Sequence, residues 1–123
     1  MSFSIPLPSD DELSDDVLTR LGELPAMNVY RVIANAPRCL VPWSDMVKAL
    51  YESQIDARYR EIAILRQAMQ ANSAYELHEH QSIALENGIT QKEIDVICSS
   101  EKVTALSKVE NAICDMAAAF GAS

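Results

Sequence analysis

The chain has 123 residues, of which 49% are hydrophobic and 23% charged, as is typical of one globular domain with its own core. Its formal net charge of −8 is unevenly spread, because residues 1–24 carry −5 and the remaining residues carry −3. Nucleic acids and anionic membrane surfaces bind cationic faces, so this balance argues against both as partners. We expect a single domain over residues 1–123, with an acidic N-terminal arm and a short helix in residues 1–24.

The composition also bears on the compartment in which the protein works. No apolar run approaches the roughly 20 residues that a membrane-spanning helix needs, and the N-terminus lacks the basic region and apolar core of a signal peptide. Cys39, Cys98 and Cys114 show neither a C-x-x-C motif nor ligand spacing, a pattern typical of reduced thiols. We therefore expect a cytoplasmic protein in which Cys98 and Cys114 pack against apolar neighbours.

The first half of the chain is expected to hold three helices after an extended segment with two prolines. Ser9 or Ser14 can cap a short helix that ends at about residue 21. A second helix begins near Asn28 and stops at Pro37, and Pro42 opens the third. In that third helix, four residues have core spacing: Trp43, Met46, Val47 and Leu50.

The second half is expected to hold four more helices joined by short turns. Asp56 caps a helix over about residues 57–71, and a break near Asn72–Ser73 precedes another over residues 74–86, closed by Asn87-Gly88. Thr90 caps a short helix, and the last runs from about residue 104 to 120. Its expected core face is Leu106, Val109, Ile113, Met116 and Ala117. The fold class is therefore all-α, with about six to seven helices and no strand.

Two polar residues fall on the apolar faces of neighbouring helices. Glu61 has aliphatic residues one turn before and after it, which places its carboxylate toward the core. His80 also points inward, in line with Ser73 and Glu76, whereas His78 lies on a half-polar face. Because a tight turn joins the two helices, Glu61, Glu76 and His80 can meet.

The pattern of these three residues allows more than one interpretation. A histidine whose tautomer is fixed by a carboxylate can act as a general acid or base near neutral pH. Periodicity by itself favours a buried polar cluster that only fixes helix register. A metal site is disfavoured, because carboxylate-bundle sites need Glu-x-x-His from each of two helices, and here Glu76 and His80 are four apart and occur once. Arg60 and Arg66 are expected to face solvent or a subunit interface.

The same residues belong to stretches with a family resemblance: residues 60–65 (REIAIL), residues 72–80 (NSAYELHEH), residues 83–84 and 87–90, and residues 28–37 upstream. In this order, over roughly residues 28–97, they resemble the carboxymuconolactone decarboxylase family. The resemblance implies an alkylhydroperoxidase-like helical fold, chemistry without a cofactor or metal, and assembly into a ring as a homotrimer or homohexamer.

The alkylhydroperoxidase-like branch of that family uses a Glu, eleven residues, a Cys, two residues, a second Cys, three residues and a His. Laid on this sequence, the pattern begins at Glu61, ends at His80, and meets Ser73 and Glu76 at the two cysteine positions. Reduction of a hydroperoxide needs a thiolate and a resolving thiol, and a serine cannot replace them. The resemblance therefore disfavours thiol peroxidase (peroxiredoxin-type antioxidant) activity.

The decarboxylase branch manages without cysteines, and its resemblance implies roles for the inward residues. His80 would be the general acid, with Glu61 or Glu76 orienting it. The implied substrate-binding groups are Ser73 or Tyr75 for a lactone oxygen and Arg58 or Arg66 for a carboxylate. Two acids at the site would repel a polycarboxylate, so the substrate is expected to be less anionic. Three function classes remain: a lyase or isomerase on a small lactone or carboxylic acid, a thiol peroxidase, which the missing cysteine pair disfavours, and a non-catalytic oligomeric binding protein.

Overall fold

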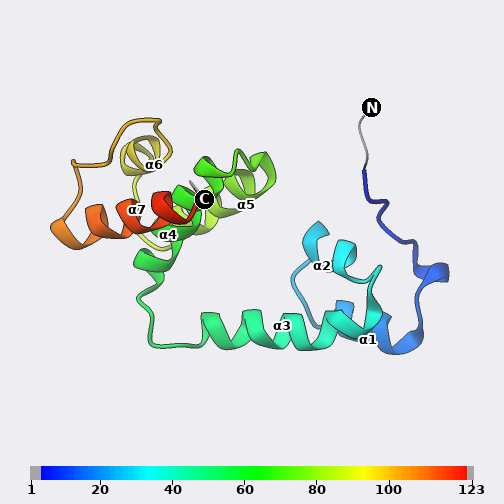
Figure 1. The fold of residues 1–123 in the computed structure, drawn as a ribbon. Coiled ribbons are helices and arrows are strands. Elements are labelled where there is room, and N and C mark those ends of the chain that lie inside the picture. Colours follow the sequence, from blue (N-terminus) through cyan, green and yellow to red (C-terminus); the bar gives the residue numbers. More distant parts are fainter. Residues whose placement is uncertain (1–3, 122–123) are drawn as a thin grey trace. The chain divides into compact units, whose positions relative to one another are not determined.

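In the computed structural model, which describes residues 4–121, the regular elements of the chain are all helices (Figure 1). Its elements are the 3-10 turn η1 (Asp10–Glu12) and the helices α1 (Asp15–Gly22), α2 (Asn28–Ile33), α3 (Pro37–Tyr51), α4 (Ala57–Gln70), α5 (Ala74–Glu86), α6 (Gln91–Ile97) and α7 (Lys108–Gly121). The all-α prediction with up to seven helices is confirmed. None of the helices in this range is long and apolar enough to cross a membrane.

The chain divides after Ser53 into two compact units, residues 4–53 and residues 54–121 of the described range. The expectation of one domain over residues 1–123 stays a prediction. The expected N-terminal arm lies in the first unit, where residues 4–9 form no regular element, and its residues 1–3 lie outside the described range. Asp10 of this arm forms an ion pair with Arg31 of α2.

Local capping explains how the first unit begins. Ser9 and Glu12 form a capping box over η1, and Ser14 occupies the N-cap of α1, so both serines named from the sequence begin a turn of helix. Its small core contains Val17, Ala34 and Leu40.

Helix α3 departs from prediction at its start and on its buried face. It begins at Pro37 rather than Pro42, because proline suits the first helical turn, where its missing N–H has no partner to lose. The predicted core positions Met46 and Leu50 are 62% and 44% exposed, and Leu40 and Ser44 are buried instead. The hydroxyl oxygen of Ser44 accepts a hydrogen bond from Arg20 Nε of α1 at 3.0 Å, which links the two helices.

The second unit is built around α4, which packs against α5, α6 and α7. Its core is aliphatic apart from one cysteine and draws on all four helices and the loops between them: Ile62, Leu65, Ala84, Ile89, Ile94, Ile97, Val103 and Cys114. Cys114 is buried here and Cys98 packs against the same core, so the expectation that both pack is confirmed.

The caps and turns around α4, α5 and α6 lie where the sequence predicts. The Asp56 carboxylate accepts from the backbone N–H of Arg58 and caps α4. The chain turns before α5 at Asn72, whose φ of 51° is one that asparagine tolerates better than most residues. Gly88, with φ 78°, ends α5, and Thr90 caps α6 through a capping box.

Helix α7 begins at Lys108, later than the predicted Thr104. The hydroxyl of Ser107 accepts from Glu110 N at 3.3 Å, and the Glu110 carboxylate accepts from Ser107 N at 2.9 Å, so this pair is the true start signal. The buried face of α7 is Glu110, Cys114 and Ala117, whereas the predicted core residues Val109 and Met116 are 53% and 55% exposed.

The expectation that Arg60 and Arg66 face solvent or a subunit interface is wrong, since both are buried within the single chain. The Arg66 guanidinium donates to three backbone carbonyls at and beyond the end of α6, those of Ile97, Ser99 and Glu101, at 2.7–3.0 Å. Carbonyls at the end of a helix lack partners within the helix, and an arginine fork supplies them. Arg66 Nε has no hydrogen-bond partner among the described residues.

Candidate functional site

The inward polar residues predicted on α4 and α5 do meet. Glu61 is completely buried, and its Oε2 lies 2.7 Å from Nδ1 of His80, which is 8% exposed. His78, on the same helix, is exposed, as its half-polar face predicted. With Glu61 as acceptor, Nδ1 carries the hydrogen, and the second ring nitrogen, Nε2, is left for another partner.

Arg60 completes the buried end of this arrangement. Its Nε donates to Glu61 Oε1 at 2.9 Å, so each oxygen of that carboxylate accepts from a different side chain. The positive guanidinium compensates the buried negative charge, which would otherwise be costly to remove from water. We call Arg60, Glu61, Glu76 and His80 the His80 cluster.

Glu76 forms the outer end of the His80 cluster. Its Oε2 lies 3.4 Å from His80 Nε2, and its side chain is 43% exposed, against 0% for that of Glu61. Ser73, the N-cap of α5, accepts from Glu76 N at 3.5 Å. The cluster therefore runs from a sealed carboxylate through the imidazole to a carboxylate that solvent can reach.

An open pocket of about 650 Å³ lies between α4 and α7 and reaches the start of α5. Three of its lining residues are polar: Gln67, Ser73 and Glu76. The others are apolar: Ala63, Ile64, Ala68, Ala71, Met116, Ala117 and Phe120. Of the His80 cluster, Glu76 is the member that lines the pocket. The structure thus brings Ser73, Glu76, His80 and Glu61 into one continuous arrangement, and Tyr75 is not among the lining residues.

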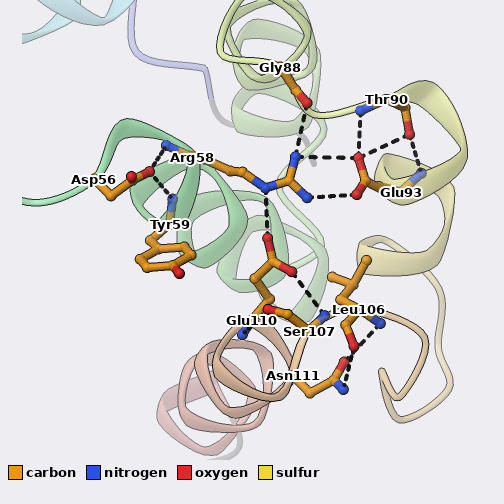
Figure 2. A network of polar contacts seen from close by, with 10 residues as sticks. All are labelled: Asp56, Arg58, Tyr59, Gly88, Thr90, Glu93, Leu106, Ser107, Glu110 and Asn111. Carbon is orange, nitrogen blue, oxygen red and sulfur yellow. Dashed lines mark hydrogen bonds and ion pairs between the residues drawn. The ribbon is translucent and has the colours of Figure 1, made fainter.

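Arg58, named from the sequence as a substrate-binding residue, lies in a different network (Figure 2). Its Nε donates to Glu110 Oε1 and its Nη2 to Glu93 Oε1, both at 2.6 Å, and its Nη1 donates to the carbonyl of Gly88 at 2.9 Å. We call Arg58, Glu93 and Glu110 the Arg58 network. All three guanidinium nitrogens of Arg58 therefore donate to groups within the protein.

Both acids of the Arg58 network are also the third residues of helices that they help to cap. Glu93 belongs to the capping box of α6 with Thr90, and Glu110 to that of α7 with Ser107 (Figure 2). The hydrogen bond from Arg58, and then that from Thr90, lowers the pKa of Glu93 to about 2. The hydrogen bond from Ser107 lowers the pKa of Glu110, and that from Arg58 adds to it. One arginine thus fixes the starts of two helices.

The remaining reactive groups of this unit lie in apolar surroundings. Burial raises the pKa of the Cys98 thiol, and it raises that of Cys114 to about 11, so neither is a thiolate at neutral pH. Within residues 4–121, no group of three or more His, Cys, Asp or Glu side chains is arranged to hold a metal ion.

The His80 cluster has the parts that acid–base chemistry needs. One ring nitrogen is fixed by a buried carboxylate, the other faces a carboxylate, and that carboxylate borders a pocket large enough for a small molecule. Such an arrangement can hold a proton at Nε2 or Glu76 and exchange it with a bound compound. The sequence found every member of this arrangement except Arg60 and the pocket walls on α7.

The family model described as the carboxymuconolactone decarboxylase family matches residues 42–119. No curated protein and no solved structure matches the chain. The matched range contains α4 to α6, most of α7 and all four residues of the His80 cluster. Since the match extends over more than half of its length, the chain belongs to the carboxymuconolactone decarboxylase family.

Proposed function

We propose that this chain is a cofactor-free enzyme of the carboxymuconolactone decarboxylase kind that moves a proton at a carbon atom of a small lactone or carboxylic acid. The observation that carries this proposal is the continuous path from Glu61 through His80 to Glu76 at the pocket. In it, His80 is the acid–base group, Glu61 and its partner Arg60 fix the ring, and Glu76 connects the ring to the pocket.

The path suits two related reactions. In a lyase reaction, the bond between the carboxylate carbon and its neighbouring carbon breaks, carbon dioxide leaves, and the electron pair passes into a conjugated carbonyl as an enolate, which then receives a proton at carbon from His80 through Glu76. In an isomerase reaction, Glu76 and His80 together remove a proton beside the carbonyl and return it at the far carbon of the enolate. The hydroxyl of Ser73, which lines the pocket, supports this as a donor to the enolate oxygen.

Thiol peroxidase activity is disfavoured on this chain. Ser73 and Glu76 stand at the positions where the peroxidase pattern has cysteines. Burial raises the pKa of Cys98 and Cys114, and an attacking thiol must first lose its proton. We expect no thiol-dependent loss of hydroperoxide.

A non-catalytic binding protein is the alternative that one observation favours. Glu61 is wholly enclosed and each of its oxygens accepts a hydrogen bond, as in a cluster that serves only stability. In that case His80→Ala would change the free energy of unfolding and the pocket would still bind a ligand, but no reaction would depend on the ring.

Assembly into a homotrimer or homohexamer is part of the same proposal. The exposed apolar side chains Val109 on α7 and Leu85 on α5, which lie outside the pocket lining, are compatible with a subunit interface. Sedimentation velocity of the full chain tests it, and a monomer at micromolar concentration would contradict it.

Deuterium exchange tests the proton transfer directly. In D2O, we expect the protein to place deuterium beside the carbonyl of an uncharged unsaturated γ-lactone (α-angelica lactone), or to turn over 4-carboxymuconolactone. His80→Ala should slow the reaction by about 10²- to 10⁴-fold, the usual contribution of a general acid or base. His78→Ala, an exposed histidine of the same helix, is the matched control and should leave the rate unchanged. Equal rates for wild type and His80→Ala with both compounds would overturn the proposal.

A further inference from the structure

The pocket between α4 and α7 carries an inference about which molecules it accepts. We propose that it binds an uncharged, largely apolar carbonyl compound, which excludes carboxylates as substrates and so leaves the isomerase form of the proposed reaction. This assignment of a substrate class rests on the proposed proton transfer at Glu76 and His80. The volume of about 650 Å³ lies within the range of pockets that enclose small organic ligands.

The walls of the pocket set its charge preference. Four alanines, an isoleucine, a methionine and a phenylalanine line it, together with Gln67, Ser73 and Glu76. No lysine, arginine or histidine is among these lining residues, and the one ionisable group, Glu76, is an acid. A carboxylate bound here would lose water without gaining a cation, and it would lie near a second negative charge.

The cations of the same unit that a carboxylate might use are engaged elsewhere. Arg60 donates to the buried Glu61. Arg66 is buried against backbone carbonyls at and beyond the end of α6. Arg58 is held by Glu93, Glu110 and the carbonyl of Gly88. The arginine clamp expected for a carboxylated lactone is therefore absent from the pocket as described, and an uncharged ligand needs none.

The polar groups of the pocket also indicate how such a ligand would lie. Ser73 and Glu76 belong to the start of α5, whereas Met116, Ala117 and Phe120 belong to α7. A carbonyl oxygen near the Ser73 hydroxyl would place the adjacent carbon near Glu76, with the apolar part of the molecule along α4 and α7. In this position an isomerisation balances with no further reactant, because the proton that leaves one carbon is returned to another.

Two fluorescent probes with the same anilinonaphthalene frame test the charge preference. N-phenyl-1-naphthylamine is uncharged, and 1-anilinonaphthalene-8-sulfonate carries one negative charge. We expect the uncharged probe to bind one site per chain at least tenfold more tightly than the sulfonate. Glu76→Gln, which removes the only charge of the lining, should strengthen sulfonate binding several-fold and leave the uncharged probe nearly unchanged. Equal or tighter sulfonate binding by the wild-type protein would overturn the proposal.

Filling the pocket tests where the probe binds. Ala63→Leu adds volume to the wall on α4 and should weaken the uncharged probe at least tenfold. Ala112→Leu makes the same change at an exposed position of α7 outside the pocket and is the matched control. Ala71→Leu, at the exposed C-cap of α4, also narrows the pocket and serves if the first variant does not fold. Equal binding by pocket and control variants would place the probe elsewhere and contradict the assignment.

The outcome separates this inference from the proposed function. If the uncharged probe binds as expected but no compound exchanges deuterium in a His80-dependent way, the pocket assignment as a binding site stands and the catalytic proposal fails. If 4-carboxymuconolactone reacts faster than α-angelica lactone, the proton transfer stands and the substrate class is wrong. If raising the protein concentration displaces the probe in step with self-association, a second copy of the chain fills the pocket and the inference is overturned.

Discussion

The His80 cluster and the Arg58 network begin one turn apart on α4 and use similar residues to different ends. In the Arg58 network, the donors of Arg58 end on two carboxylates and a backbone carbonyl, and both acids also cap helices. In the His80 cluster, the buried end is equally complete, but the outer end is a 3.4 Å contact beside a pocket. A network closed by helix caps fixes structure, whereas one that ends at a pocket can exchange a proton with a ligand.

Burial sharpens the contrast. Glu61 is fully enclosed, whereas the side chains of Arg58 and Glu93 are 27% and 29% exposed. A buried charge without its partner is far more costly than one that water can reach. Substitutions in the two networks should therefore differ in how much they lower the free energy of unfolding. They should also differ in whether they change binding at the pocket.

Glu61→Ala should give the largest effect. It removes the acceptor of Arg60 Nε and His80 Nδ1 together, so we expect a loss of about 3–5 kcal/mol in the free energy of unfolding, as for breaking a buried ion pair. Glu61→Gln keeps the shape and one acceptor oxygen, and its loss should be smaller by at least about 1 kcal/mol. Urea unfolding followed by circular dichroism measures both. Equal losses for the two variants would show that the shape and the remaining acceptor oxygen add little, and that the charge of Glu61 carries the whole effect.

Arg58→Met should give the next largest effect. The methionine keeps the aliphatic stem but leaves Glu93 and Glu110 without their shared cation, and we expect a loss of about 2 kcal/mol, reduced by the access of water. Binding of the uncharged probe should stay within twofold of wild type, because Arg58 does not line the pocket. A tenfold loss of probe binding in an Arg58→Met variant that remains folded would show that the Arg58 network also shapes the pocket, and would contradict the separation of the two networks.

Acid should remove the stability that the Arg58 network contributes to the fold. The pKa of Glu93 is lowered from an ordinary value of 4.5 to about 2 in the folded chain, and that of Glu110 is also lowered. A lowered folded-state pKa stabilises the protein above the unfolded value, so this contribution is complete above pH 4.5 and is lost as the pH falls toward 2. Urea midpoints between pH 5 and pH 2.5 should fall less steeply for Arg58→Met than for wild type. Parallel slopes would mean that Arg58 does not depress either pKa.

Sequence reasoning succeeded where the signal is local. Three such signals are the turn at Asn72, the glycine at position 88 and the capping box of Thr90. Each depends only on residues within about four positions of itself, and the structure has all three. The inward faces of Glu61 and His80 followed from helical periodicity, which also needs only neighbours.

The parts that were missed depend on contacts between distant segments. Arg66 is buried because it donates to carbonyls more than 30 positions along the chain. The residues near Arg66 in the sequence carry no signal that predicts these contacts. The Arg58 network joins three helices in the same way. The start of α7 is different, because its Ser107-x-x-Glu110 signal is local and stands in the sequence, where Thr104 offers a competing start three residues earlier.

The smallest expected effect tests whether the Arg58 network is a single unit. Ser107→Ala removes the hydroxyl that caps α7 and should cost about 1 kcal/mol. Because the Ser107 side chain and Arg58 both lower the pKa of Glu110 through hydrogen bonds, the loss in the double variant should depart from the sum of the two single losses by about 0.5 kcal/mol or more. Ser73→Ala makes the same change at the cap of α5, where the partner is Glu76 of the His80 cluster, and its loss should simply add to that of Arg58→Met. Coupling of Arg58 to Ser107 but not to Ser73 would establish the two networks as energetically separate, and equal coupling to both would join them into one.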